Sequence, residues 1–240
     1  MGSPSTVTAL VVCPTYNERD NLPLLVRGVL AHDGFRILVV DDGSPDGTGA
    51  VADRLAAEHP GRIEVMHRTG PRGLGRSYVD GLRHALKTEA ALIFQMDADL
   101  SHNPEYLPAL AAGAVDHDVV IGSRYLNGVS VVNWPLRRIF LSTFANRYIR
   151  LVTGLTPTDC TSGFRCWRRD ALARIPLDRV ASAGYAFLVE MLYRAAENGS
   201  RIGEVPIIFV ERRQGQSKVS RAVLLESLAT PWRLRLRRRA

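Results

Sequence analysis

Short apolar runs rich in β-branched residues alternate along this chain with segments of helical periodicity, and this alternation limits the possible folds more than any other feature. The strand-like runs lie at 7–13, 37–40, 63–67, 91–96 and 119–122. The segments between them repeat apolar residues every three or four positions, as amphipathic helices do. Strands that alternate with helices pair mostly in parallel. The sequence therefore predicts an α/β fold, a Rossmann-like open sheet with helices on both faces.

The regular alternation weakens after about residue 125. Three further elements are predicted there: a helix at 134–155, a strand at 205–210, and a second amphipathic helix at 221–236 that Pro231 interrupts. A chain of 240 residues fits one large domain. We therefore expect one main domain at 1–220 and an amphipathic basic C-terminal segment at 221–240.

Composition excludes several classes of protein. Hydrophobic residues make up 46% of the chain and charged residues 23%, which is typical of a globular protein and not of a disordered one. No apolar run reaches the length of about 18 residues that crosses a bilayer, and the N-terminus lacks a secretory signal pattern. The three cysteines are too few and too scattered for a disulfide framework. We therefore expect a protein of the reducing cytoplasm.

The formal net charge of +7 is concentrated at the C-terminal end. Five arginines lie between residues 233 and 239, and no acidic residue occurs among the last ten. Trp232, Leu234 and Leu236 alternate with these arginines, a pattern that suits an anionic membrane surface. A disordered tail and a nucleic-acid-binding module are the alternative interpretations.

Polar residues follow three of the predicted strands at the point where each strand ends. These segments lie at 14–18, 41–48 and 97–99. In open α/β sheets, ligands bind beyond the carboxyl ends of the strands. Four carboxylates are therefore expected to converge on one edge of the sheet: those of Asp41, Asp42, Asp97 and Asp99.

Asp97 and Asp99 form a D-x-D pair directly after a predicted strand. Two carboxylates on one side of a strand repel each other unless a cation lies between them or one is protonated. Hard divalent ions such as Mg²⁺ or Mn²⁺ take oxygen ligands and share substrate phosphates. The alternative is a solvated loop before a helix that Asn103 and Pro104 begin.

The segment at 41–48 is an acidic turn with three structure-breaking residues. Asp42 is a candidate for hydrogen bonds to a ribose or a base, whereas Asp46 and Thr48 are better interpreted as the cap of the next helix. Tyr16 offers a flat ring and Glu18 an acceptor to a base, although both also suit a simple helix-capping loop. Residues 70–75 do not form a dinucleotide-binding fingerprint.

Taken together, these segments resemble the inverting family 2 glycosyltransferases that include the polyprenol-phosphate (dolichol-phosphate) mannosyltransferases. The resemblance extends from about residue 7 to residue 218. It rests on these ordered blocks: PTYNE at 14–18, DDGSPDGT at 41–48, GLG at 73–75, MDADLSH at 96–102, GSRY at 122–125, SGFR at 162–165, GEVPI at 203–207 and GQSK at 215–218.

The resemblance implies a GT-A fold, with a nucleotide-sugar half at about 7–125 and an acceptor half at about 126–220. It also implies roles for individual residues. The donor site would comprise Pro14, Tyr16, Glu18, Val40, Asp42, Asp97, Ala98, Asp99, Arg124, Arg212 and Lys218. Of these, Asp97, Asp99, Arg124 and Lys218 would take part in the reaction. Asp97, Asp99 and Ser101 would hold Mg²⁺ or Mn²⁺, although some relatives carry glutamine at the position of Ser101. Arg137 or Arg138 would bind the acceptor phosphate; each of these cations also suits a solvated surface.

The activity implied by the resemblance is transfer of mannose from GDP-mannose to a polyprenyl or dolichyl phosphate. The expected enzyme is bacterial and peripheral at the inner face of the membrane, where the stripe from Phe140 to Leu151 is a candidate lipid contact or, alternatively, a core-packing face. A membrane-spanning partner domain or protein would suit this location, and no nucleic acid is expected. The alternatives are a family 2 transferase using UDP-glucose or another donor, nucleotidyl transfer, and nucleic-acid binding.

Overall fold

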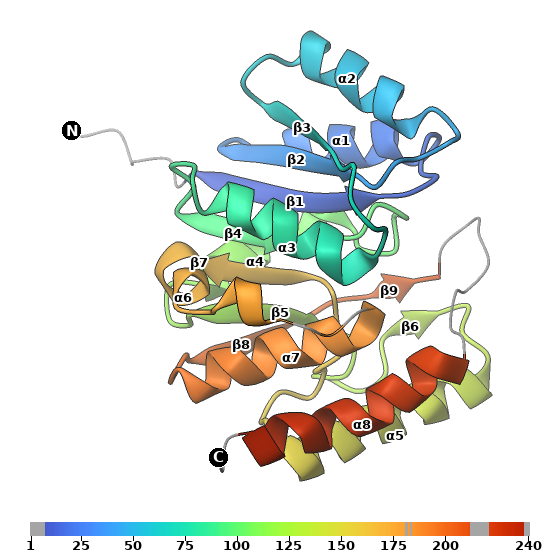
Figure 1. The fold of residues 1–240 in the computed structure, drawn as a ribbon, viewed down its shortest axis with the longest axis vertical. Helices are drawn as coiled ribbons and strands as arrows, with labels where there is room; N and C mark the ends of the chain where they lie inside the picture. Colours follow the sequence, from blue (N-terminus) through green and yellow to red (C-terminus); the bar gives the residue numbers. More distant parts are fainter. Residues whose placement is uncertain (1–7, 181, 183, 212–220, 238–240) are drawn as a thin grey trace.

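The structure is a computed structural model that describes residues 8–180, 182, 184–211 and 221–237. Figure 1 shows a central sheet flanked by helices. In chain order the elements are β1 (Ala9–Thr15), α1 (Leu22–Leu30), β2 (Phe35–Asp41), α2 (Thr48–Glu58), β3 (Ile63–His67), α3 (Leu74–Ala85), β4 (Leu92–Gln95), η1 (Pro104–Tyr106), α4 (Leu107–Gly113), β5 (Val119–Ser123), β6 (Val131–Val132), α5 (Leu136–Thr153), β7 (Arg165–Arg168), α6 (Arg169–Ala173), η2 (Leu177–Arg179), α7 (Gly184–Glu197), β8 (Ile202–Pro206), β9 (Phe209–Val210) and α8 (Arg221–Arg237).

The main sheet has seven strands in the order β3-β2-β1-β4-β7-β5-β8. All neighbouring strands pair in parallel except β7, which is antiparallel to both β4 and β5. The parallel strands β1 to β5 confirm the α/β fold that the alternating pattern predicts. Strand β7 was not predicted, because its four residues RCWR carry an arginine at each end and resemble a surface segment.

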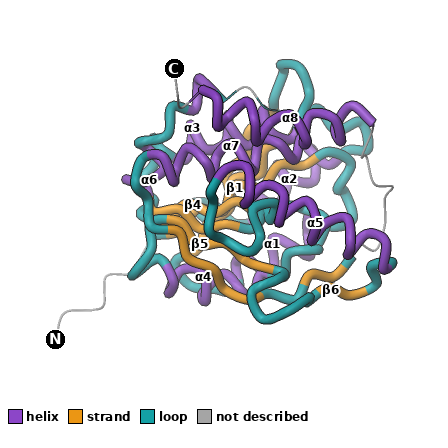
Figure 2. Tube along the Cα trace, turned by 90° about the horizontal axis from the view of Figure 1, so that it is seen from below, coloured by secondary structure: helices purple, strands orange, loops and turns teal. Residues whose placement is uncertain are grey.

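Alternate residues of each central strand enter two different apolar clusters on opposite faces of the sheet. Leu10 and Val12 of β1 pack beneath α3 and α7, in a cluster that also contains Leu82 and Phe187. Val11 of β1 belongs to the other cluster, with residues of α1, α2 and α4. Figure 2 shows the strands as a layer with α3 and α7 on one side and α1 and α4 on the other. Helices therefore cover both faces, and the polar edge at the strand ends remains for ligands.

Helix α3 approaches the sheet unusually closely. A Cβ atom added to Gly81 would lie 2.5 Å from Cγ1 of Val12 and 2.9 Å from Cγ2 of Val40. Real Cβ atoms essentially never make such contacts, so glycine is required for this packing. The close approach brings the N-terminal half of α3, with Tyr78, toward the carboxyl ends of the strands.

Two predictions for the C-terminal region were wrong in detail. Pro231 does not interrupt α8, which continues through it, because Leu234 in the next turn is buried against the neighbouring helices α5 and α7. The Tyr148 hydroxyl of α5 also donates a 2.8 Å hydrogen bond to the carbonyl oxygen of Leu228, one turn before the proline. The late strand predicted at 205–210 is two strands, β8 and β9, and β9 leaves the main sheet to pair with β6.

Candidate active site

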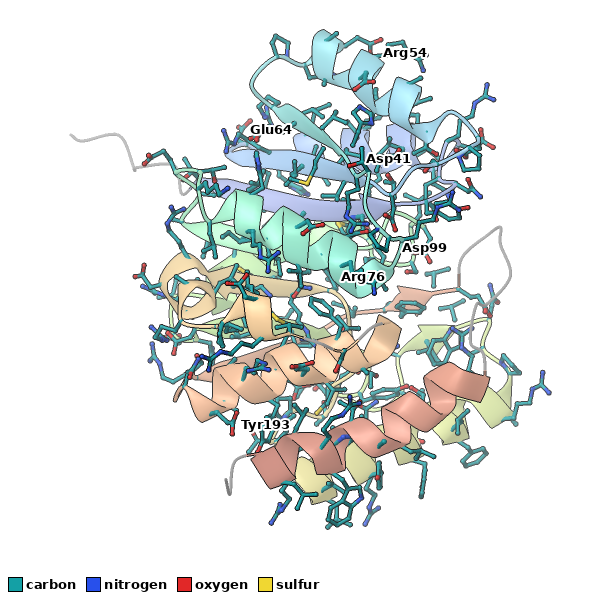
Figure 3. All side chains as sticks on the ribbon, viewed as in Figure 1. Asp41, Arg54, Glu64, Arg76, Asp99 and Tyr193 are labelled. Carbon is teal, nitrogen blue, oxygen red and sulfur yellow. The ribbon has the colours of Figure 1, made fainter. Side chains whose placement is uncertain are left out.

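The predicted polar segments do meet at one edge of the sheet. Asp41 ends β2, and Asp97 follows β4 by two residues. Figure 3 labels Asp41 and Asp99 at this same end of the molecule. The carboxyl ends of parallel strands point the same way, which is why segments far apart in the sequence share this edge.

Two buried residues orient Asp97. The hydroxyl of Tyr78 donates a 2.7 Å hydrogen bond to Oδ1 of Asp97, and the backbone N–H of Asp97 donates to Nδ1 of His102 over 3.1 Å. Burial, followed by the nearby Asp97 charge, raises the pKa of Tyr78 well above its usual value, so the phenol remains a neutral donor. Burial lowers the pKa of His102. Asp97 is therefore held from both its side chain and its backbone.

Asp99 is oriented by its own turn. The backbone N–H and the hydroxyl of Ser101 both donate to Oδ1 of Asp99, over 3.1 and 2.5 Å. The side chains of Asp97 and Asp99 are partly exposed, whereas Ser101 is buried. Within the described ranges, no group of three or more His, Cys, Asp or Glu residues is arranged to hold a metal ion. A pair of carboxylates fits a hard divalent ion that takes its remaining oxygen ligands from substrate phosphates and water.

The predicted nucleoside residue Asp42 is already held by two partners. The guanidinium of Arg68 forms an ion pair with Oδ1, and the backbone N–H of Gly73 donates to Oδ2 over 2.8 Å. Arg68 also donates to Asp80 over 2.8 Å and is itself buried. Asp42 therefore presents a fixed carboxylate at the end of β2.

Asp41 has a structural role in the turn after β2. Its Oδ1 accepts hydrogen bonds from the hydroxyls of Thr15 and Ser44, and the side chain is buried. Asp46 accepts from both the backbone N–H and the hydroxyl of Thr48, the first residue of α2, over 3.0 and 2.6 Å. The predicted cap was wrong, because the N-cap residue is Gly47 and the helix has no side-chain cap.

The remaining donor-site candidates differ in exposure. Tyr16 is partly exposed, and the Arg72 guanidinium lies 4.9 Å from its ring centroid while donating to its hydroxyl over 2.7 Å. Glu18 accepts a 2.8 Å hydrogen bond from the side chain of Asn21. Pro14, Val40 and Ala98 are buried, so only their backbone atoms are placed to contact a donor.

Arg124 forms a bidentate ion pair at this edge. Its Nε and Nη2 donate to the two oxygens of Asp159, each over 2.7 Å, and Asp159 is completely buried. Burial would raise the pKa of Asp159, but the Arg124 charge and several hydrogen bonds outweigh it and lower the pKa. Arg124 is therefore fixed in one orientation by a carboxylate that remains ionised.

Aromatic rings connect the carboxylate pair to the arginines. The ring of Phe209 on β9 lies 5.7 Å from that of His102 and 5.5 Å from that of Trp134. The guanidinium carbons of Arg124 and Arg138 lie 5.5 and 3.9 Å from the centroid of Trp134. The acidic and basic halves of the site are thus adjacent.

The other predicted cations of the site are not part of these aromatic contacts. Arg137 is exposed, and Arg212 and Lys218 lie outside the described residues.

A cavity of about 620 Å³ lies beside this edge, between α5 and the loops at 124–130 and 154–158. Tyr125 and Thr158 line it next to the Arg124 and Asp159 pair, and Arg147, Arg150 and Leu151 of α5 line its other side. Its lining contains no acidic residue. The cavity therefore combines apolar walls with two cations.

Comparison with known families decides what kind of protein has this site. A family model described as glycosyl transferase family 2 matches residues 10–175. This chain belongs to that family. Polyprenol monophosphomannose synthase from Mycolicibacterium smegmatis is 48% identical to this transferase over 228 residues, covering 93% of this chain and 85% of the relative. Undecaprenyl-phosphate mannosyltransferase from Micrococcus luteus is 46% identical over 231 residues, covering 95% of each chain.

Solved structures agree with the fold of this family 2 transferase. Glucosyl-3-phosphoglycerate synthase from Mycobacterium tuberculosis, in complex with Mn²⁺, UDP-glucose and phosphoglyceric acid, aligns with a TM-score of 0.67 at 18% identity. The match covers 93% of this chain and 79% of that chain. This likeness confirms the predicted GT-A fold.

Several site residues of this transferase were not predicted. Tyr78 was assigned only to the apolar stripe of a helix, and Asp159 and Arg68 had no role. Trp134 was only the first residue of a predicted helix. Tyr78, Asp159 and Arg68 act through partners at least 19 residues away in the chain, so no local pattern marks them. Trp134 contacts both Arg138, four residues away, and Arg124, ten residues away.

Proposed function

We propose that this enzyme transfers mannose, with inversion, from GDP-mannose to a polyprenyl monophosphate of the dolichyl type. The observation that carries the proposal is near full-length identity of 48% to a polyprenol monophosphomannose synthase. The site supports it, because a carboxylate pair suited to a metal-bound diphosphate lies beside arginines suited to a phosphate monoester.

Asp97 and Asp99 would hold the donor's divalent ion, Mg²⁺ or Mn²⁺, with Ser101 orienting Asp99. When bound, such an ion neutralises charge that develops on the diphosphate leaving group. Asp42, fixed by Arg68, would accept hydrogen bonds from the nucleoside, and Tyr16 would stack on the base. Tyr78 and His102 would orient Asp97.

The acceptor needs no strong general base, because the second pKa of a phosphate monoester is about 6. Its ionised oxygen would form the new bond to the anomeric carbon as the bond to the diphosphate breaks and the electron pair leaves with GDP. Arg138 would hold the acceptor phosphate in line for this attack. We assign Arg124, which was predicted from the sequence for the donor site, to the same phosphate, because both guanidinium groups contact the ring of Trp134. Arg212 and Lys218 remain predicted phosphate contacts, and Lys218→Ala is expected to reduce turnover sharply.

The acceptor's lipid tail requires contact with a membrane, and α5 supports such contact. Phe140, Phe144 and Leu151 are exposed on this helix, so the interpretation as a core-packing face is not supported for them. Trp232 and Leu236 of α8 are also exposed, whereas Leu234 is buried and cannot contact lipid. None of the helices in the described part of the chain is long and apolar enough to cross a membrane. The exposed apolar side chains of α5 and α8 support our proposal of peripheral attachment, which we place at the cytoplasmic face.

Radiolabelled GDP-mannose incubated with the protein, Mn²⁺ or Mg²⁺ and polyprenyl phosphate should deliver label to the organic phase. The same assay with UDP-glucose tests the alternative donor, and GDP should raise the melting temperature more than UDP does. Label that remains entirely in the aqueous phase with GDP-mannose, but is transferred from UDP-glucose, would contradict the proposed donor.

A further inference from the structure

Two arginines of the site share one aromatic ring. The guanidinium carbon of Arg138 lies 3.9 Å from the ring centroid of Trp134, and that of Arg124 lies 5.5 Å from it. Guanidinium groups are attracted to the faces of indole rings. Trp134 therefore contacts both cations, one directly after β5 and the other in the first turn of α5.

The two arginines have counter-ions of very different character. Asp159, the partner of Arg124, is completely buried, and Thr161 donates to it from its backbone N–H and its hydroxyl. Its own N–H donates over 3.1 Å to Glu204. Removing such a carboxylate from its partners would leave a buried charge unpaired, which is strongly unfavourable. Asp159 is thus a permanent partner.

Glu211, the partner of Arg138, is held far less firmly. It pairs with Nη1 of Arg138 through Oε1, and each of the two side chains is 33% exposed. Its backbone N–H donates to the carbonyl oxygen of Val132 over 3.3 Å, which anchors the main chain and leaves the side chain to rotate. Exposed ion pairs of this kind contribute only about 0–1 kcal/mol. A stronger anion can therefore displace this carboxylate.

We propose that Glu211 is an exchangeable counter-ion that occupies Arg138 until a phosphate monoester displaces it, whereas Asp159 keeps Arg124 in place throughout. The phosphate monoester is the acceptor of the proposed function, on which this inference rests. A phosphate dianion carries more charge than a carboxylate and offers more acceptor oxygens, so it competes effectively for the guanidinium.

An unused donor supports a ligand at this position. The indole N–H of Trp134 is buried and has no hydrogen-bond partner among the residues that the structure describes. Buried donors without a partner are unfavourable by about 1–3 kcal/mol, so an acceptor from a bound ligand or a water molecule would stabilise this N–H. A phosphate bound at Arg138 within hydrogen-bond reach of this N–H would give it an acceptor.

The test measures binding of a water-soluble short-chain prenyl phosphate by titration calorimetry, without a donor sugar. Glu211→Gln removes the competing charge and keeps the size of the side chain, so the dissociation constant should fall about three- to five-fold. Glu64→Gln is the matched control, because Glu64 and its partner Arg36 are 32% and 33% exposed. Figure 3 labels Glu64 away from Asp99 and the site edge. The control should bind as the wild type does.

Unchanged or weaker binding by Glu211→Gln overturns the inference, and so does an equal gain in Glu64→Gln, which would indicate a general effect of net charge. Failure of the proposed function has a different signature. In that case the wild type would transfer no mannose to the prenyl phosphate, while Glu211→Gln would still bind the phosphate more tightly than the wild type.

Discussion

The phenol of Tyr78 on α3 and the carboxylate of Asp97 after β4 are joined by a 2.7 Å hydrogen bond at the centre of the site. The phenol ring is fully buried and stacks on Phe187 of α7, with ring centroids 5.7 Å apart and planes inclined by 6°. The hydroxyl is thus held in place by packing from two helices. Asp97 receives a donor whose position does not depend on a mobile surface residue.

Tyr78→Phe removes this donor and keeps the ring. Groups that orient a metal-binding carboxylate typically change metal affinity by about 10- to 100-fold, so Mn²⁺ affinity in the presence of GDP should fall by at least about ten-fold. Electron paramagnetic resonance of free Mn²⁺ measures this directly. Because the stacked ring is retained, the melting temperature should change little. Wild-type Mn²⁺ affinity in the variant would show that Tyr78 does not orient a metal ligand.

Asp159→Asn leaves the buried Arg124 without its counter-ion. At neutral pH the free energy of unfolding should fall by about 3–5 kcal/mol, measured by urea denaturation. The control is Asp118→Asn at the opposite end of β5, where the 3.7 Å pair with Arg201 is exposed on the arginine side and should contribute less than about 1 kcal/mol.

At acidic pH, the free energies of unfolding of Asp159→Asn and of the wild type should differ less than at neutral pH. The folded-state pKa of Asp159 lies below its ordinary value, so the wild type gains stability from the ionised carboxylate at neutral pH. This gain is lost as the pH falls from about 4 through the lower folded-state pKa. Urea curves at several pH values between 6 and 3 test the trend. If the difference in free energy of unfolding between the two proteins stayed constant from pH 6 to pH 3, this prediction would be wrong.

Gly81→Ala tests the close packing of α3 on the sheet. Alanine usually stabilises a helix interior by about 1 kcal/mol relative to glycine. Here the added methyl group would lie 2.5 Å from Val12, so the steric conflict should dominate and lower the free energy of unfolding by about 1–3 kcal/mol. Urea denaturation decides the sign. A variant more stable than the wild type would show that α3 can move away from β1 at little cost.

Phe140→Ser and Phe144→Ser test the membrane contact of α5. Both rings are exposed beside arginines of the same helix, so their removal should weaken sedimentation with vesicles that contain anionic lipid. Val115→Ser, which changes a residue 73% exposed after α4, is the control and should sediment as the wild type does. Equal losses in all three variants would argue against a specific contact through α5.

Much of this fold can be predicted from local patterns in the sequence. Short apolar runs rich in β-branched residues predict the parallel strands β1 to β5, because strands covered by helices on both faces bury both sets of side chains. The period of 3.6 residues predicts the helices between them, because each helix buries one stripe of its side chains. Topology then brings Asp42, Asp97 and Asp99 to one edge, since parallel strands end on the same side. These inferences need only neighbouring residues and the general rules of sheets.

Strand β7 shows where local patterns fail. Arg165 begins this strand and is completely buried, with its guanidinium donating to the carbonyl oxygens of Ser162, Leu188 and Cys160. An arginine in a short segment predicts a surface position, because an unpaired buried charge is unfavourable. Only the folded chain supplies the three acceptors that make this burial possible.

The sequence alone determined the layered α/β sheet, the polar edge and the acidic pair, because the spacing of residues along the chain encodes them. Tertiary structure alone decided that Tyr78 orients Asp97, that Asp159 holds Arg124 and that Trp134 joins Arg124 to Arg138. Arg124 and Asp159 are 35 residues apart in the chain. Their hydrogen bonds form only after the intervening loops close, and that closure depends on packing throughout the core rather than on any local pattern.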